Sequence, residues 1–106
     1  SSLEGVLKIL KKKHLVDSIT ISGKDGALIV SSEGNGSSEA LTGTALMNYV
    51  ASEMPGSESI MVKTGDGWKM LMPFGDKIYI IKAASEMNQV EFKALSKEIE
   101  EHLKSL

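Results

Sequence analysis

Three stretches of the chain have the apolar spacing of helices that are buried on one side. In the first stretch the apolar residues fall at positions i, i+3, i+4 and i+7, namely Leu3, Val6, Leu7 and Leu10. Ser1 and Glu4 have the spacing of a capping box at its start. The second stretch covers about residues 38–54 and ends at a Pro-Gly pair. The third runs from Asn88, a favourable N-cap, to the C-terminus.

Five shorter stretches are predicted as β-strands. Ile19 and Ile21 alternate with small hydroxyl residues, which is the signature of a half-buried strand, and a Gly-Lys-Asp-Gly turn joins it to a strand over residues 27–30. Three further strands, at residues 59–64, 68–72 and 77–83, are separated by turns at residues 65–67 and 73–76. The last strand is apolar almost throughout, so we expect it to be central, with helices on both faces of the sheet. The predicted element order is α-β-β-α-β-β-β-α, and no connection in it requires a parallel sheet. This order predicts a fold that mixes helices and strands, of the α+β type within the broad α/β class, with three layers in the arrangement αβα.

The composition is that of an ordinary globular domain and excludes several kinds of site. The 106 residues are 42% hydrophobic and 25% charged, and a chain of this length is expected to form one domain over residues 1–106. All 12 basic residues are lysine and 14 residues are acidic, so the formal net charge is −2. The absence of cysteine excludes a disulfide framework, a cysteine nucleophile and a thiolate zinc site.

Charge and hydropathy also bear on partners and location. Acidic and basic residues are mixed along the chain, whereas a nucleic-acid binder normally concentrates its cations on one face. No apolar run approaches the roughly 18 residues of a membrane span, and the first residues lack the apolar core of a secretion signal. The sequence therefore predicts a cytoplasmic protein that neither binds nucleic acid nor spans a membrane.

The middle helix has two apolar faces. A broad arc that includes Met54 is wide enough to pack on the sheet, whereas a second patch lies roughly opposite, with Leu41, Ala45 and Tyr49 at i, i+4 and i+8. Polar residues, among them Asn48, border this second patch. An apolar patch with a polar rim is what a partner helix buries. The alternative is that the terminal helices or a loop of the same chain cover it.

The strand over residues 59–64 strengthens the partner interpretation. It directly follows the helix with two apolar faces, and it forms an edge of the sheet if the chain order places it outermost. Unpaired backbone groups at such an edge invite pairing with another copy, although Lys63 would protect the edge in part. Besides the helix residues, the candidate partner surface therefore includes three strand residues, Ser59, Met61 and Lys63.

Candidate catalytic or ligand-binding groups are few and scattered. His14 and His102 stand at or near the ends of the terminal helices with no acidic or serine partner that spacing would bring close, which is typical of helix-end histidines. Glu98 and Glu100 are expected on the solvated outer face of the last helix. The glycine-rich residues 34–38 precede a helix but lack the lysine and the spacing of a phosphate-binding loop. No nucleophile, base and oxyanion-binding set emerges, so the sequence predicts no enzyme, metal site or cofactor.

Three local signatures, in their order along the chain, resemble those of the roadblock family. The first is the glycine-bounded hairpin at residues 23–30, and the second is the small-residue helix at residues 40–51. The third is the proline-glycine turn at residues 73–76 before the apolar strand at residues 78–81. This family of small proteins includes dynein-associated light chains and prokaryotic regulators of Ras-like GTPases. The resemblance covers nearly the whole chain.

The resemblance implies a five-stranded antiparallel sheet with the order 2-1-5-4-3, the middle helix on one face and the terminal helices on the other. It also implies a dimer, formed with a second copy or a roadblock paralogue, in which the third strands pair and the middle helices pack. Family members are non-enzymatic platforms for small GTPases or for motor and signalling complexes, and some stimulate GTP hydrolysis. Because the chain has no arginine, any stimulation here must come from positioning the GTPase's own groups rather than from an arginine finger.

A monomeric sensory domain of profilin-like or PAS-like shape is the alternative from another functional class. Such a domain would hold a small ligand between the sheet and a helix, and the long apolar strands and abundant methionine are compatible with it. Against this alternative, the sequence shows no polar residue evidently stranded among the core positions, where it would orient a ligand.

Overall fold

The computed structural model describes residues 2–104, which form three helices and five strands in the predicted order. In chain order these are α1 (Leu3–His14), β1 (Ser18–Gly23), β2 (Leu28–Ser31), α2 (Ser37–Glu53), β3 (Ile60–Thr64), β4 (Gly67–Phe74), β5 (Lys77–Ala83) and α3 (Gln89–Lys104). β4 continues two residues beyond its predicted end, so Pro73 and Phe74 belong to the strand rather than to a turn. None of the helices within the described residues is long and apolar enough to cross a membrane.

The two terminal helices are capped by side chains, with one shift from the predicted positions. Ser2 rather than Ser1 caps α1, and its hydroxyl accepts a hydrogen bond from the Gly5 amide at 3.1 Å; Ser1 lies outside the described residues. Asn88 caps α3 as predicted. Its side chain accepts a hydrogen bond from the Glu91 amide at 2.9 Å and donates one to the Glu91 carboxylate at 2.8 Å.

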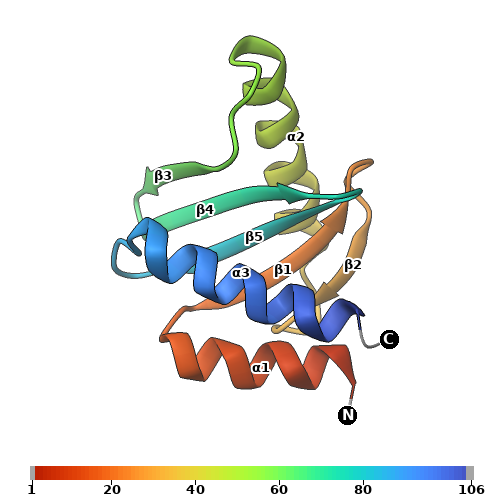
Figure 1. Ribbon diagram of the computed structural model, residues 1–106, viewed down its shortest axis with the longest axis vertical. Helices are drawn as coiled ribbons and strands as arrows, with labels where there is room; N and C mark the ends of the chain where they lie inside the picture. The colour runs from red at the N-terminus through yellow and green to blue at the C-terminus, as the bar shows by residue number, and fades with distance from the viewer. Residues whose placement is uncertain (1, 105–106) are drawn as a thin grey trace.

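All five strands form one antiparallel sheet with the order β2-β1-β5-β4-β3, so the predicted topology is confirmed. α1 and α3 cover one face of the sheet and α2 lies on the other, which gives the three layers of an α+β fold (Figure 1). β5 is the central strand and is buried along most of its length, as its apolar sequence predicted.

The two faces of the sheet carry hydrophobic cores of unequal size. Under α1 and α3, the buried apolar side chains are Leu7, Leu10, Val16, Ile19, Ile21, Met70, Tyr79, Ile81, Ala83, Met87, Phe92, Leu95 and Ile99. Under α2, the corresponding buried cluster consists of Met47, Leu71, Ile78 and Ile80. Most of the stabilising apolar burial therefore lies beneath the terminal helices.

β1 is buried on both faces, so the prediction of a half-buried strand is wrong. Its serine and threonine side chains face α2 rather than solvent, because α2 packs over this strand. Ser22 shares a hydrogen bond of 2.7 Å with Thr44 of α2, and Thr20 shares one of 3.2 Å with Ser31 of β2. Buried hydroxyls with such partners are readily accommodated, which is why a polar row is tolerated inside the fold.

α1 and α3 lie side by side, and one acidic side chain links them. Glu98 of α3 accepts hydrogen bonds from Lys13 at 3.0 and 3.1 Å, and His14 Nε2 lies 3.2 Å from its Oε1 atom. Lys13, and to a lesser degree His14, holds the pKa of Glu98 below its usual value. The predictions that Glu98 faces solvent and that His14 lacks an acidic partner are therefore wrong, because the contact joins residues 84 positions apart.

Tyr79 on β5 offers a test of the larger core. Its side chain is fully buried, its hydroxyl has no hydrogen-bond partner among residues 2–104, and burial, with a smaller contribution from Glu100, raises its pKa to about 12. We expect Tyr79→Phe to raise the free energy of unfolding by about 1 kcal/mol at neutral pH, because it removes an unpaired polar group and keeps the ring. Urea denaturation measures this gain, and a less stable variant at neutral pH would contradict it.

The advantage of the phenylalanine variant should grow at alkaline pH. The unfolded chain releases the phenolic proton near pH 10.0, whereas the folded chain holds it up to about pH 12, so the wild-type protein loses stability as the pH rises through this window. The variant lacks this loss, and titration of the lysines affects both proteins alike. An advantage that stays constant between about pH 8 and about pH 11 would show that Tyr79 does not titrate in this way.

Candidate functional site

α2 presents an apolar stripe that nothing in the described chain covers. Leu41 and Tyr49 are 63% and 64% exposed, and Ala45 between them is also exposed. α1 and α3 lie on the other face of the sheet, and the last turns of α2 project beyond the sheet (Figure 1). The alternative in which the terminal helices or a loop bury this patch within one chain is therefore wrong for residues 2–104.

The projection of α2 also changes the role of Met54. The helical pattern places Met54 on the arc that faces the core, but its side chain is 58% exposed. Residues 51–56 are exposed throughout, because the sheet ends before the helix does. Ala40, Met47 and Val50 of the same arc are buried, so the predicted arc holds for the part of the helix that overlies the sheet. Met54 adds an exposed apolar group at the projecting end.

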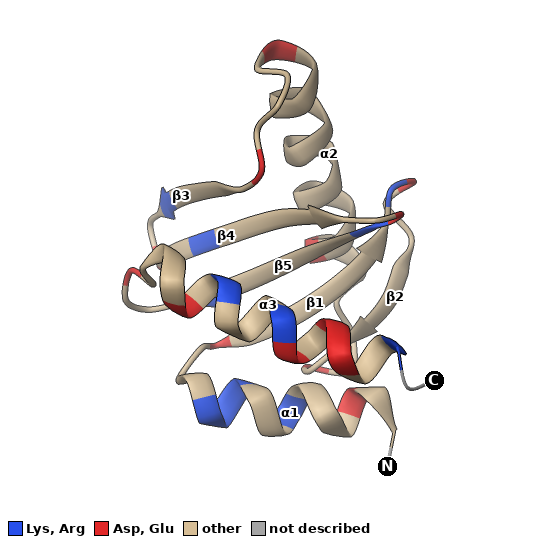
Figure 2. Cartoon of the chain, viewed as in Figure 1, with Lys and Arg blue, Asp and Glu red and all other residues tan. Residues whose placement is uncertain are grey.

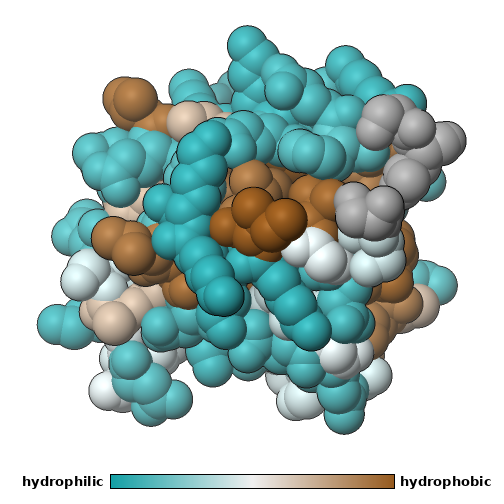
Figure 3. Space-filling model, turned by 90° about the horizontal axis from the view of Figure 1, so that it is seen from below, coloured by the Kyte–Doolittle hydropathy of each residue, from teal (hydrophilic) through white to brown (hydrophobic). Residues whose placement is uncertain are grey.

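Charged residues are sparse on α2. Its 17 residues include two charged side chains, Glu39 and Glu53, which lie toward its ends. α1 and α3, by contrast, carry lysine and acidic residues along their length (Figure 2). Seen from below, the molecule is mostly hydrophilic, with small separate apolar areas (Figure 3). The exposed face of α2 therefore has the composition of an interface core, where charged residues are depleted.

β3 is the outermost strand of the sheet and pairs with β4 alone among the described strands. The register places Ile60 and Val62, both half-buried, on the same face as Leu71 and hence on the face of α2. Met61 and Lys63 lie on the face of the terminal helices. The structure therefore separates Met61 and Lys63 from the helix stripe. Sequence analysis missed Ile60 and Val62, which strict alternation along the strand would have indicated.

The other two predicted partner residues flank the stripe and the edge strand. Asn48 is exposed, and its side-chain amide donates a hydrogen bond of 3.4 Å to the Lys24 carbonyl in the β1–β2 turn. Ser59 is half-buried directly before β3, where it lines a cavity of about 340 Å³ together with Met72 and Phe92. The structure thus gathers the four helix residues on one side of α2 and spreads the three strand residues along the sheet edge.

A polar cavity of about 240 Å³ lies between the start of α2 and the turn that joins β3 to β4. The first residues of β1 and the last residues of β5 line it, and the segment between β2 and α2 closes one side. Gly36 in this segment packs closely on the sheet, because a Cβ atom there would lie 2.9 Å from the Ser31 side chain and 3.2 Å from Thr20. The glycine-rich segment therefore serves to bring the chain close to the sheet, a role that its sequence did not reveal.

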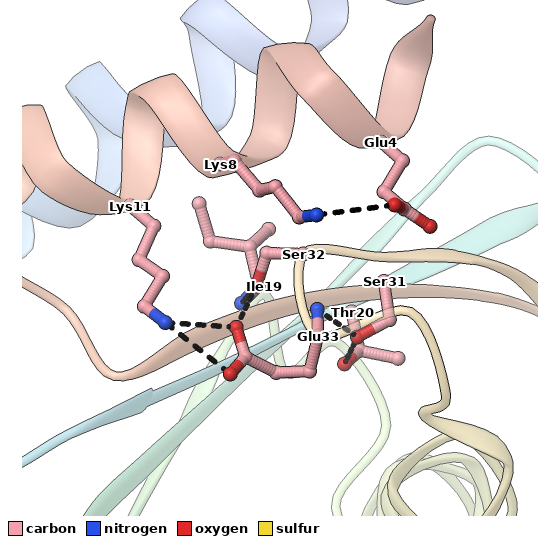
Figure 4. Close-up of polar contacts among 8 residues, drawn as sticks. All are labelled: Glu4, Lys8, Lys11, Ile19, Thr20, Ser31, Ser32 and Glu33. Atoms are coloured by element: carbon pink, nitrogen blue, oxygen red, sulfur yellow. Dashed lines mark hydrogen bonds and ion pairs between the residues drawn. The ribbon is translucent and has the colours of Figure 1, made fainter.

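Hydrogen bonds anchor this side of the cavity to α1 and β1 (Figure 4). Glu33 accepts hydrogen bonds from Lys11 Nζ at 2.9 and 3.2 Å and from the Ser32 hydroxyl at 2.8 Å. The bond from Lys11, followed by that from Ser32, holds the pKa of Glu33 below its usual value. The Ser32 hydroxyl in turn accepts a hydrogen bond from the Ile19 amide at 2.9 Å.

Glu39 of α2 lies between two lysines of the sheet at the cavity. Lys69 and Lys82 are cross-strand neighbours on β4 and β5, and their Nζ atoms lie 3.1 and 3.4 Å from the two carboxylate oxygens of Glu39. One carboxylate therefore faces two ammonium groups. Within residues 2–104, no group of three or more His, Asp or Glu side chains is arranged to hold a metal ion.

The element order, the three layers and the sheet order together define the fold of roadblock domains, and profilins have a similar architecture. MglB of Myxococcus xanthus is 16% identical to this chain and superposes with a TM-score of 0.72 over 98% of this chain and 96% of MglB. A Roadblock/LC7 domain of Streptomyces avermitilis is 13% identical, with a TM-score of 0.69 over 98% of this chain and 99% of that domain. Profilin IB of Acanthamoeba castellanii is 14% identical, with a TM-score of 0.63 over 96% of each chain.

The chain has the roadblock fold, as its sequence signatures predicted. No family profile matches the sequence, and no curated protein matches it either. At these identities the likeness establishes the fold alone, and the function has to be argued from the surface of this chain.

Proposed function

We propose that this protein is a non-enzymatic module that dimerises and, as a dimer, binds or regulates a Ras-like small GTPase or acts as a scaffold for a motor or signalling complex. The observation that carries the proposal is the exposed, uncharged stripe of Leu41, Ala45 and Tyr49 on α2, together with the free edge of β3. A surface with few charges and with an aromatic residue has the composition of an interface core. The roadblock fold supports the proposal, because the family resemblance implies a dimer built from these two elements.

A second copy of the chain is the partner that the stripe fits. A two-fold axis brings the same residues of both chains together, so the surface has to be compatible with itself. The stripe meets this condition because it contains no charged residue that would face its own copy. The unpaired backbone of β3 meets it too, since an antiparallel strand can pair with its own copy across the axis. A roadblock paralogue with the same kind of stripe would fit in the same way.

The GTPase as a further partner rests on the roadblock resemblance and fold. Such a partner places the module in the cytoplasm. Because residues 1–106 contain no arginine, this chain supplies no arginine finger, a group worth about 10³–10⁵ in hydrolysis rate. We therefore expect binding to act on the GTPase by positioning the GTPase's own groups.

Two measurements test the proposal separately. Light scattering at micromolar concentration is expected to give twice the 11.4 kDa mass of one chain, and a mass of one chain only would contradict the dimer. Pull-downs against the small GTPases of the same genome, each loaded with GDP or with a GTP analogue, are expected to recover at least one of them. Single-turnover hydrolysis by that GTPase is then expected to rise by less than about 10³-fold. Capture of no GTPase in either nucleotide state would contradict this part and leave the dimer standing.

A further inference from the structure

The turn between β3 and β4 determines which backbone groups of β3 point to the free edge of the sheet. This turn consists of residues 65 and 66, so the pair that closes it, Thr64 and Gly67, is a hydrogen-bonded pair. Hydrogen-bonded and non-hydrogen-bonded pairs alternate along an antiparallel ladder. The N–H and C=O groups of Met61 and Lys63 therefore point away from β4 and toward the free edge.

Pro73 on β4 supports this alternation. Gly67 and Pro73 direct their backbone groups to the same side of β4, the side of β3, because an even number of positions separates them. β3 ends its pairing at Leu71, so Pro73 faces the open edge. Proline has no N–H group to donate, and at this position the ladder between β4 and β5 loses no hydrogen bond.

The free edge of β3 has little protection against pairing. The Nζ atom of Lys63 lies 5.9 Å from the centroid of the Trp68 ring on β4, so this side chain leans back over the sheet rather than across the edge. Proline and β-bulges are other features that keep sheet edges apart, and the five residues of β3 contain neither. β3 is therefore open to a further strand.

A two-fold axis allows few registers for two copies of β3. Because both strands bond through the backbone groups of Met61 and Lys63, the axis has to pass through a residue rather than between two residues. An axis at Val62 pairs all five residues of each strand, and any other position pairs three or fewer. An axis at Lys63 also sets two like charges directly opposite each other, which is destabilising.

We propose that the partner of β3 is a second copy of this chain, paired in the one register that places Val62 on the two-fold axis. This inference rests on the dimer of the proposed function and specifies its partner and geometry. Val62 meets its own copy on the face of α2, and Met61 meets Lys63 of the partner subunit on the opposite face. The methylene stem of a lysine packs on an apolar side chain while its ammonium group stays in water. The strand is thus complementary to itself, and no paralogue is required.

Disulfide cross-linking tests the register, because the chain contains no cysteine of its own. Across the axis the two Val62 residues form a non-hydrogen-bonded pair, whose Cα atoms lie about 4.5 Å apart, within the range that a disulfide spans. The Met61 residues of the two copies lie roughly 8–9 Å apart, which is too far. We expect Val62→Cys to form a disulfide-linked dimer under mild oxidation at least about 10-fold faster than Met61→Cys, the matched control.

The double variant Ile60→Cys/Thr64→Cys tests the register independently, also if Val62→Cys fails to fold. In the proposed register Ile60 lies opposite Thr64 of the partner subunit, again as a non-hydrogen-bonded pair. Within one chain the two positions lie about 13 Å apart along the strand, so no disulfide forms inside a chain. We expect the double variant to give a linked dimer on a non-reducing gel and each single variant to remain unlinked.

Light scattering on the same samples separates the register from the dimer itself. A dimer in which Val62→Cys links no faster than Met61→Cys would overturn the register and leave the proposed dimer standing. Faster linking of Met61→Cys would move the axis to Met61 and overturn the register in the same way. A protein that stays monomeric in light scattering would overturn the dimer and the register together.

Discussion

A Leu41→Glu variant is expected to be monomeric at concentrations at which the wild-type protein is dimeric. In a two-fold interface the substitution places two carboxylates in a desolvated contact, and we expect self-association to weaken by roughly 100-fold or more. Leu41 is 63% exposed within one chain, so the fold of the chain should be kept. Sedimentation velocity measures the association, and circular dichroism measures the fold.

Ile9→Glu is the matched control for this experiment. Ile9 on α1 is 65% exposed, almost the same fraction as Leu41, but it lies on the opposite side of the sheet. We expect this control variant to remain dimeric. Loss of the dimer in both variants would mean that the effect is not specific to α2, and an unchanged dimer in Leu41→Glu would refute the assigned interface. Tyr49→Lys tests the same stripe independently if Leu41→Glu fails to fold.

A Gly67→Ala variant is expected to lose roughly 3 kcal/mol of unfolding free energy. Gly67 begins β4 with a φ of +143°, a backbone conformation that residues with a side chain rarely adopt. A Cβ atom there would also lie 2.5 Å from the Ala83 carbonyl oxygen and 3.1 Å from the Ala84 Cα atom. Both obstacles are backbone atoms, which cannot move aside as the end of a flexible side chain can.

Gly65→Ala tests whether the effect belongs to Gly67 or to the turn as a whole. Gly65 is two residues away in the same turn, and a Cβ atom there would meet nothing within 4 Å. We expect this variant to unfold within about 0.5 kcal/mol of the wild-type protein. Urea denaturation of both variants gives the comparison, and similar losses in the two would refute the steric explanation.

The spacing of apolar residues was sufficient to predict the elements and their order, because helical and strand periodicities are local properties. Ile19 and Ile21 lie on the predicted face of β1, and the start of α3 follows from Asn88 alone. The periodicity did not reveal what covers the second face of a strand. The alternating pattern predicted that Ser18, Thr20 and Ser22 of β1 face solvent. These side chains are buried because α2 packs over β1 in the folded chain.

The candidate site was predicted only as far as it lies on a single element. Leu41, Ala45 and Tyr49 share one face of α2 by helical geometry, so their common exposure follows from their spacing. The contact of Glu98 with His14 and the cavity at Ser18 each join segments that are far apart in the chain. No local pattern specifies such contacts, because they depend on how the layers pack.

The unequal cores on the two faces of the sheet have a consequence for how the protein responds to a partner. The sheet and the terminal helices share the larger cluster of buried side chains, whereas α2 is held by the smaller one. We expect α2 to open more readily than the central strand, so its amides should exchange with deuterium sooner than those of β5. A partner that covers α2 stabilises this helix against local opening by mass action. Local unfolding and recognition are thus linked in the same helix.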